Sequence, residues 1–250
     1  MKIAFIGDSF SAYDQEGQGK NHWSYLLAQQ FPQHQYFNYS LGGRGYDYFR
    51  LAIVDAKMKD VDVVVTNRTF NHRTFQHYGD KDGMFEISEE VNKNYTNLAY
   101  SCHYWYSVHS DTVVRNINSP APAHIEKSIK EALSAQSMST AYQNFNKNWY
   151  DNMDSLYNFK HIIKLELLED PNDENVDSAY LYLLKNFNIW QIVQEQFYES
   201  DGTLDIHILK DKLLLENDLI ISEDDNHWSP KANKWVFDNY ILPKFVDILS

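Results

Sequence analysis

The first seventy residues alternate between short apolar runs and helical patterns, and this alternation constrains the fold more than any other feature. Apolar runs at residues 3–6 and 61–65 are typical of buried strands, and residues 36–37 indicate a shorter strand between them. Apolar residues at helical spacing separate these runs: Trp23, Leu26, Leu27 and Phe31 before Pro32, then Phe49, Ala52, Ile53 and Ala56. Strand, helix, strand, helix, strand at these intervals predicts a doubly wound parallel sheet.

The rhythm changes between about residues 74 and 199. Residues 124–157 and 175–198 favour helices, because their apolar residues recur at helical steps. Between them, residues 161–168 resemble a fourth strand that ends before Pro171. We therefore expect a long, largely helical insertion at about residues 74–199.

The last fifty residues hold the fifth strand and a final helix. Residues 204–209 and residues 219–222 are alternatives for this strand. Ser229 is a plausible N-cap and Pro230 suits the first helical position. No internal repeat or low-complexity linker interrupts the chain. We expect one domain over residues 1–250, a flavodoxin-like three-layer α/β/α sandwich with a mostly parallel five-stranded sheet.

Charge and composition exclude several classes of partner. The chain has 22 Lys and Arg against 35 Asp and Glu, a net charge of -13, which argues against nucleic acid and anionic membranes as partners. Cys102 is the one cysteine, so no intrachain disulfide or cysteine-based zinc site can form. We expect no secretory signal, because the apolar run after Met1 is too short for a signal core, and no apolar run approaches the roughly 20 residues that span a bilayer. We expect a cytoplasmic protein, with virion association or export without a cleaved signal as alternatives.

Three loops at strand ends carry residues suited to acyl transfer. In an open α/β sheet, ligands bind outside the carboxyl ends of the strands, and here these are the loops at residues 7–11, 40–45 and 66–73. Ser9 lies in the first loop, where its hydroxyl would face the edge of the sheet. The alternative is structural, because Asp8-Ser9 after a strand also suits a helix cap.

A possible base for Ser9 lies near the C-terminus. A serine nucleophile needs a base to remove its proton, and a histidine base needs a carboxylate to orient it. Asp224 precedes His227 by three residues, within reach of its side chain. The alternative is a solvated acidic loop with a surface histidine. Asp224 and His227 indicate a catalytic role only in combination with Ser9 in the first loop.

Four blocks of the sequence resemble the SGNH (GDSL-like) hydrolase family, named for Ser, Gly, Asn and His in separate blocks. Residues 7–11 (Gly-Asp-Ser-Phe-Ser) are similar to the first block and residues 38–43 (Asn-Tyr-Ser-Leu-Gly-Gly) to the second. Residues 62–71 are similar to the third, and Asp224-x-x-His227 to the fourth. The blocks occur in the family's order and span almost the whole chain, although the insertion has no counterpart in them.

The third block departs from the family pattern at two positions. The family's block ends Gly-x-Asn-Asp, whereas this chain reads Thr69-Phe70-Asn71-His72. Asn71 falls where the family's oxyanion asparagine stands. Asn67 is a weaker candidate for that role.

The resemblance implies a serine esterase that needs no metal or organic cofactor. Ser9 would be the nucleophile and His227 the base, oriented by Asp224 or by its neighbour Asp225. The oxyanion would be held by the N–H groups of Ser9 and Gly43, with Gly42 as the alternative to Gly43, and by the side chain of Asn71. Three arginines on the site loops are candidates for substrate binding or for ordinary ion pairs with nearby acids: Arg44, Arg68 and Arg73.

The expected substrate class rests on the composition of the insertion. We favour a short acyl ester, such as an acetyl group on a glycan, because aromatic residues in the insertion suit stacking on sugar rings. A lipase, a thioesterase and an acyltransferase are the alternatives within the family. Outside it, the alternatives are a non-catalytic binding module and a structural or virion-associated protein on the same fold. The sequence leaves the oligomeric state open.

Overall fold

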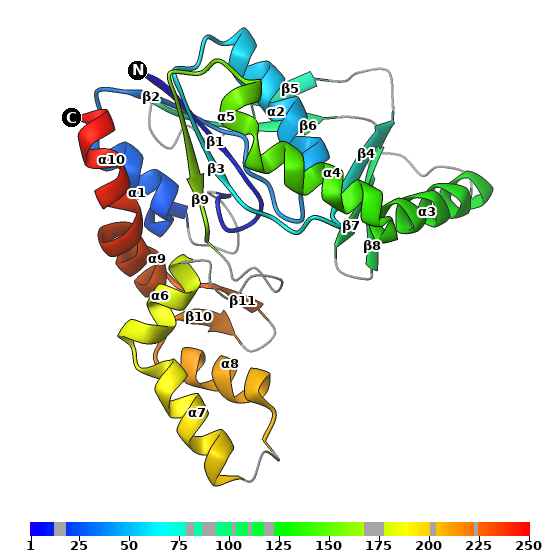
Figure 1. Cartoon of the computed structure of the whole chain (residues 1–250). Coiled ribbons are helices and arrows are strands. Elements are labelled where there is room, and N and C mark those ends of the chain that lie inside the picture. The colour runs from blue at the N-terminus through cyan, green and yellow to red at the C-terminus, as the bar shows by residue number, and fades with distance from the viewer. Residues whose placement is uncertain are drawn as a thin grey trace. The chain divides into compact units, whose positions relative to one another are not determined.

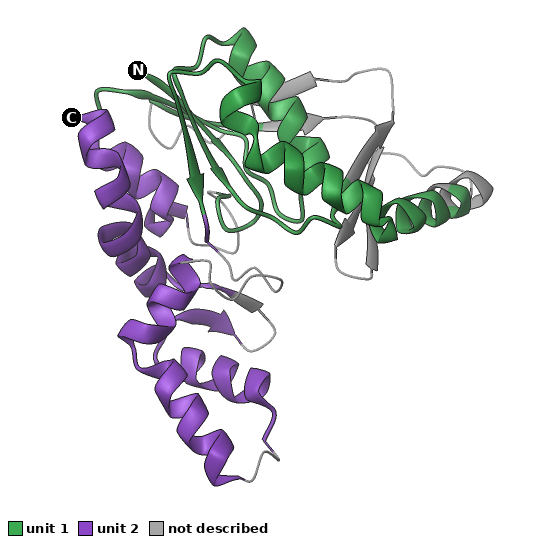
Figure 2. Ribbon diagram, in the orientation of Figure 1, with its two compact units in different colours: residues 1–12, 32–165 green, residues 13–31, 166–250 purple. Residues whose placement is uncertain are grey.

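The computed structural model (Figure 1) describes most of the chain. The described residues are 1–12, 19–78, 83–86, 94–101, 104–109, 112–117, 123–167, 178–200, 204–222 and 225–250. They form two compact units (Figure 2). Unit 1 consists of Met1–Ala12 and Pro32–Leu165, and unit 2 of Tyr13–Phe31 and Glu166–Ser250.

Unit 1 is built on a six-stranded sheet with the order β5-β6-β2-β1-β3-β9. Its strands are β1 (Lys2–Ile6), β2 (Gln35–Asn38), β3 (Val63–Asn67), β5 (Gly83–Glu86), β6 (Tyr95–Ser101) and β9 (His161–Leu165). The strands from β6 to β9 are parallel, and β5 pairs antiparallel with β6 at the edge. The five parallel strands and their helices confirm the predicted α/β/α, flavodoxin-like class.

The central strands have the sequences expected of strands buried on both faces. Every residue of β3 is buried, and its Val63, Val64 and Val65 form a β-branched run. In β1, Ile3 pairs with Val63, and Ile6 pairs with Thr66. This register brings the carboxyl ends of the two strands to the same edge of the sheet.

Helices of unit 1 cover an aromatic core. They are α2 (Tyr46–Met58), α3 (Ala123–Met138), α4 (Thr140–Asp151) and α5 (Met153–Leu156). Tyr46 and Phe49 of α2 pack with Trp149 and Tyr150 of α4 in one buried cluster that also includes Val64 of β3. The prediction of helices over residues 124–157 is therefore confirmed.

The insertion contains strands that the sequence did not predict. Residues 74–117 contribute β5 and β6 to the main sheet and form a separate antiparallel sheet, in the order β4-β7-β8. Its strands are β4 (Thr74–Tyr78), β7 (Tyr104–His109) and β8 (Thr112–Ile117). Helix α3 lies against β7.

Both alternatives for the fifth parallel strand are wrong, because β6 takes that place. Residues 206–216 form a helix, α8, instead. Asp205 caps it, since its carboxylate accepts hydrogen bonds from the N–H groups of His207 (2.8 Å) and Ile208 (3.3 Å). Residues 220–222 do form a strand, β10, but it pairs antiparallel with β11 outside the parallel sheet.

Unit 2 is mainly helical. It contains a 3₁₀ turn η1 (Gly19–Asn21), α1 (Trp23–Gln30), α6 (Ala179–Asn186), α7 (Ile189–Glu199), α8 (Ile206–Glu216), β10 (Ile220–Ser222), β11 (Asp225–Trp228), α9 (Pro230–Val236), a π-helical turn η2 (Phe237–Ile241) and α10 (Leu242–Leu249). The predicted start of the last helical region is confirmed. Ser229 Oγ accepts the N–H of Ala232 at 3.1 Å, and Pro230 is the first residue of α9.

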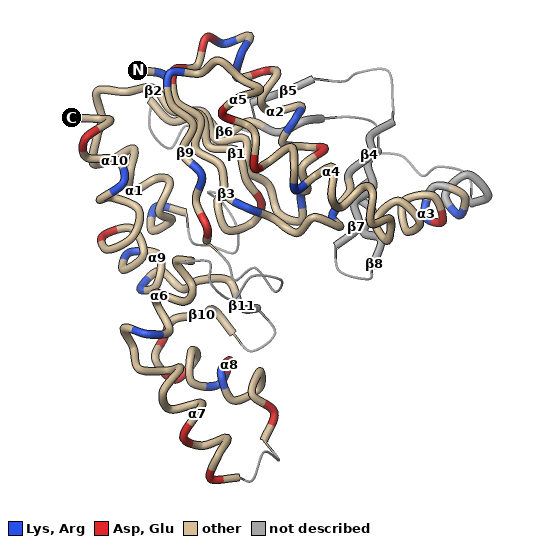
Figure 3. Tube along the Cα trace, viewed as in Figure 1, with Lys and Arg blue, Asp and Glu red and all other residues tan. Residues whose placement is uncertain are grey.

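Acidic and basic residues are interspersed along the described helices (Figure 3). Lys127 and Glu131 pair one turn apart on α3, and Lys234 of α9 pairs with Asp238 of η2. None of the described helices is both long and apolar enough to cross a membrane.

Candidate active site

The three predicted loops follow β1, β2 and β3 in unit 1, and hydrogen bonds join them. The N–H of Leu41 donates to the carbonyl of Gly7 at 3.1 Å, which joins the second loop to the first. Asn38 Nδ2 donates to the carbonyl of Ser11 at 3.2 Å. The hydroxyl of Thr69 lies 3.4 Å from the carbonyl of Arg44, between the third loop and the second. The sheet therefore brings the three loops together as predicted.

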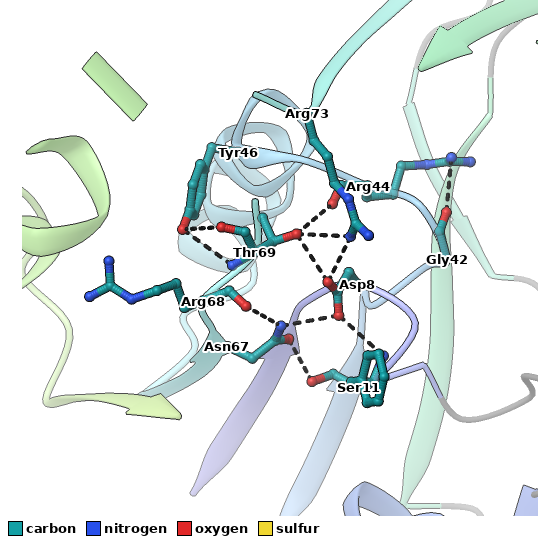
Figure 4. Close-up of polar contacts among 10 residues, drawn as sticks. Asp8, Ser11, Gly42, Arg44, Tyr46, Asn67, Arg68, Thr69 and Arg73 are labelled. Carbon is teal, nitrogen blue, oxygen red and sulfur yellow. Dashed lines mark hydrogen bonds and ion pairs between the residues drawn. The ribbon is translucent and has the colours of Figure 1, made fainter. Parts of the chain in front are cut away.

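The carboxylate of Asp8 is the centre of a buried polar network (Figure 4). Its Oδ1 accepts the N–H of Phe10 and Nδ2 of Asn67, both at 3.1 Å. Its Oδ2 accepts Thr69 Oγ1 at 3.0 Å and Arg73 Nη1 at 2.8 Å. Asp8 is fully buried, so this carboxylate fixes the first loop to the third and is closed to substrate.

Asn67 has a structural role that removes it from the oxyanion candidates. One proton of its side-chain amide goes to Asp8, and Nδ2 also donates to the carbonyl of Arg68 at 2.9 Å. An asparagine amide has two such protons, so neither is left for a substrate oxygen. Its Oδ1 accepts the hydroxyl of Ser11 at 2.7 Å. Asn67 thus holds the first loop at two points.

Ser9 lies in the turn that these contacts fix. The N–H of Ser11 donates to the carbonyl of Asp8 at 3.1 Å, and the N–H of Ala12 to the carbonyl of Ser9 at 3.3 Å. Neither the hydroxyl nor the N–H of Ser9 makes a hydrogen bond to any residue that the structure describes. Ser9 is only 7% exposed, so a reacting group would meet it in a largely desolvated setting.

Gly43 occupies a turn that requires glycine. The N–H of Arg44 donates to the carbonyl of Leu41 at 3.3 Å and closes the turn, with Gly43 at φ 69°. Glycine adopts this left-handed conformation without the strain that a Cβ causes. Within the described parts of the chain, the N–H of Gly43 donates to no acceptor. It is therefore available to a substrate oxygen.

Asn71 is held by its backbone and not by its side chain. Its carbonyl accepts Nδ2 of Asn146 at 2.9 Å, and the N–H of Arg73 closes a turn onto Phe70 at 3.1 Å. The side-chain amide of Asn71 makes no hydrogen bond with the residues described. Of the two asparagines proposed from the sequence, Asn71 is the one whose amide N–H groups have no acceptor in the described part of the chain.

The three arginines of these loops all have partners in unit 1. Arg73 is 4% exposed and pairs with Asp8, and Arg68 pairs with Asp151 at 3.1 Å. Arg44 donates from Nη1 to the carbonyl of Gly42 at 3.2 Å and is also buried. For Arg73 and Arg68, the ion-pair alternative is the one that the contacts favour.

Two tyrosines near the loops, the buried Tyr46 and the half-buried Tyr142, act as hydrogen-bond donors. The hydroxyl of Tyr142 donates to the carboxylate of Asp47 and lies 3.2 Å from the carbonyl of Arg73. Burial raises the pKa of Tyr142, and the negative charge of Asp47 raises it further. Tyr46 similarly donates to the carbonyl of Thr69 at 3.0 Å. A phenol that keeps its proton holds the third loop and does not serve as a base.

His227 belongs to unit 2. It lies in β11 and is half-buried, between Asp225 at the beginning of that strand and the buried Trp228. The carbonyl of Trp228 accepts Nδ2 of Asn233 at 3.1 Å, which fixes the backbone beside the histidine. Asp224, the predicted orienting residue, lies outside the described residues.

The network around Asp8 was not predicted from the sequence, although Asp8 and Arg73 both lie in the predicted loops. The signal in the sequence is an acidic residue two positions after a buried strand, since a buried carboxylate needs donors. Among the described residues, no group of three or more His, Cys, Asp or Glu is placed to hold a metal ion. No protein-family model matches the chain, and no curated protein matches it significantly.

Proposed function

We propose that this protein is a serine hydrolase of the SGNH type that cleaves short acyl esters, with Ser9 as its nucleophile. One observation carries the proposal. The turn around Ser9 is fixed on both sides, through Asp8 before it and Ser11 two residues after it, while the hydroxyl and N–H of Ser9 have no partner among the described residues. A residue that served only as a cap would use its own side chain for that purpose.

The reaction would proceed through an acyl-enzyme. His227 accepts the proton of Ser9 as the serine oxygen attacks the ester carbonyl carbon. The C–O bond to the leaving alcohol then breaks, and the imidazolium gives its proton to the alcohol oxygen. Water attacks the acyl-enzyme with the same base, which releases the acid and restores Ser9. Asp224, or Asp225 beside it, would stabilise the imidazolium.

Three donors are available for the negative oxygen of the tetrahedral intermediate. These are the N–H groups of Ser9 and Gly43 and the side-chain amide of Asn71. All three belong to unit 1 and lie on loops that follow neighbouring strands. Donors without an intramolecular partner cost no hydrogen bond when they turn to a substrate.

We further propose a short acyl group, such as acetyl on a glycan, as the group removed. The low exposure of Ser9 favours a small acyl group. Phe145 on α4 is 57% exposed and offers a ring on which a sugar can stack.

Hydrolysis of a short aryl acetate tests the proposal, because an activated leaving group needs little positioning. Ser9→Ala should abolish turnover and leave the circular dichroism spectrum unchanged. Ser155→Ala, at an exposed serine of α5, is the matched control and should keep full activity. Equal turnover by Ser9→Ala would refute the assignment. A series of esters with longer acyl chains should show falling kcat/KM, and a maximum at long chains would refute the short-acyl preference.

A further inference from the structure

The carboxylate of Asp8 is a buried charge placed next to the proposed nucleophile. Asp8 is fully buried, and four donors surround its two oxygens: Phe10, Asn67, Thr69 and Arg73. Removing a carboxylate from water is costly unless it is both paired and hydrogen-bonded. Arg73 is the charged member of this set, so it supplies the compensating charge.

The contacts of Arg73 tie two loops into one unit. Its Nη1 atom lies 2.8 Å from Asp8 Oδ2 and 3.0 Å from Thr69 Oγ1, so a single nitrogen joins the first loop to the third (Figure 4). Its guanidinium also lies over the ring of Phe70, 4.6 Å from the ring centroid. The backbone of Arg73 also packs against Gly45. A Cβ added to Gly45 would lie 2.5 Å from the carbonyl oxygen of Arg73, so no side chain fits there.

This arrangement has an electrostatic consequence for the adjacent serine. Attack on an ester places a negative charge on the substrate oxygen close to Ser9. An unpaired carboxylate on the preceding residue would oppose that charge, and in a buried setting solvent screens the repulsion weakly. The ion pair with Arg73 cancels the charge of Asp8 while its hydrogen bonds hold the turn.

We propose that Arg73 is a positioning residue for Ser9 that acts through its ion pair with Asp8, in two ways: it fixes the turn and it neutralises the carboxylate beside the nucleophile. This inference rests on the proposed function of Ser9. It assigns Arg73 no contact with the substrate, in contrast to the substrate-binding role considered from the sequence.

The test compares Arg73→Gln, Asp8→Asn and the double variant, with activity expressed per site that reacts with a fluorophosphonate. Arg73→Gln should lower kcat about 10- to 100-fold with little change in KM, as expected for a misplaced nucleophile. Lys59→Gln is the matched control. Lys59 also pairs with an acid, Asp55 at 2.8 Å, but lies at the C-terminal end of α2 outside the three loops, and its variant should keep the kcat of the wild type.

The double variant separates charge cancellation from a general loss of packing. It leaves no unpaired buried charge, so its kcat should be at least about threefold above that of Arg73→Gln. If Arg73→Gln does not fold, Asp8→Asn takes its place, and the kcat of the double variant is compared with that of Asp8→Asn. A wild-type kcat for Arg73→Gln, or a double variant no faster than the single one, would overturn the inference. Both results leave the proposed function intact, because that function fails only if Ser9 itself does not react.

Discussion

The side chain of Asn67 lies against the backbone of Gly7 so closely that a Cβ on Gly7 would be 1.9 Å from Asn67 Oδ1. The same added atom would lie 2.7 Å from Cβ of Ser11. The first loop is therefore pressed against the end of β3, and the contact depends on the absence of a side chain at residue 7.

Gly7→Ala should destabilise the protein and reduce its activity together. The added methyl forces Asn67 or Ser11 to move, and overpacking of this kind costs about 1–3 kcal/mol. Denaturant unfolding followed by circular dichroism measures the loss, and aryl acetate turnover measures the displacement of Ser9. An unchanged unfolding midpoint would show that the loop can shift without cost.

Asn71→Ala should lower activity, whereas Asn67→Ala should lower stability. Asn71→Ala should lower kcat by about 10²–10³, the loss expected for one oxyanion donor, with little change in stability. Its carbonyl, which accepts Asn146 Nδ2, remains in place. Asn67→Ala should instead lower the free energy of unfolding by about 1–3 kcal/mol, because it leaves buried partners unsatisfied.

Thermal unfolding and steady-state kinetics on both variants distinguish these outcomes. A stable Asn67→Ala variant with the larger loss of kcat would move the oxyanion role to Asn67. It would also contradict the hydrogen bonds that occupy both of its amide protons.

The sequence predicted those parts of the fold that follow from local pattern. The runs at residues 3–6 and 61–65 predicted the strands β1 and β3, because central parallel strands are apolar on both faces. The position of the site loops then followed from the rule for strand ends. Strand β6 was not predicted, because Thr96 and Asn97 interrupt its apolar residues. It is part of the sheet through its pairing with β2.

The partnership of Asp8 and Arg73 could not be predicted in the same way. The two residues are 65 positions apart, and nothing in a single sequence pairs one acid with one base at that separation. The fold decides the pairing, because it places the ends of β1 and β3 side by side. A local interaction also explains why residues 204–209 are not a strand. The side chain of Asp205 caps the N-terminus of α8, although the apolar residues that follow it alternate as in a strand.

Turnover should depend on the acidic residues before His227. The imidazolium that forms when the histidine takes the proton of Ser9 needs a carboxylate to stabilise and orient it. Asp224→Asn should lower kcat by up to about 10⁴-fold, the loss that follows removal of the orienting carboxylate in a serine triad. Asp225→Asn is the matched control. A larger loss in the control would assign the orienting role to Asp225.

Three tyrosines that are buried or half-buried should make the fold sensitive to alkali. Burial raises the pKa of Tyr36, Tyr39 and Tyr142 above the ordinary value of 10.0, and for Tyr39 the hydrogen bond to Asp55 adds to the shift. A raised pKa in the folded state means that the stabilisation is complete below about pH 10 and is lost as the pH rises further. Absorbance at 295 nm should show some phenols ionising only when circular dichroism reports unfolding. Full ionisation of all tyrosines in the folded protein would contradict this expectation.

Reaction with a fluorophosphonate tests the central claim most directly, because it needs an activated serine and no knowledge of the substrate. The intact mass should increase by one phosphonyl group per chain, and peptide mapping should place the group on Ser9. Ser155→Ala should react like the wild type, His227→Ala should react far more slowly, and Ser9→Ala should not react. A folded wild-type chain that remains unlabelled, or that carries the label on another residue, would contradict the assignment of Ser9 as the nucleophile.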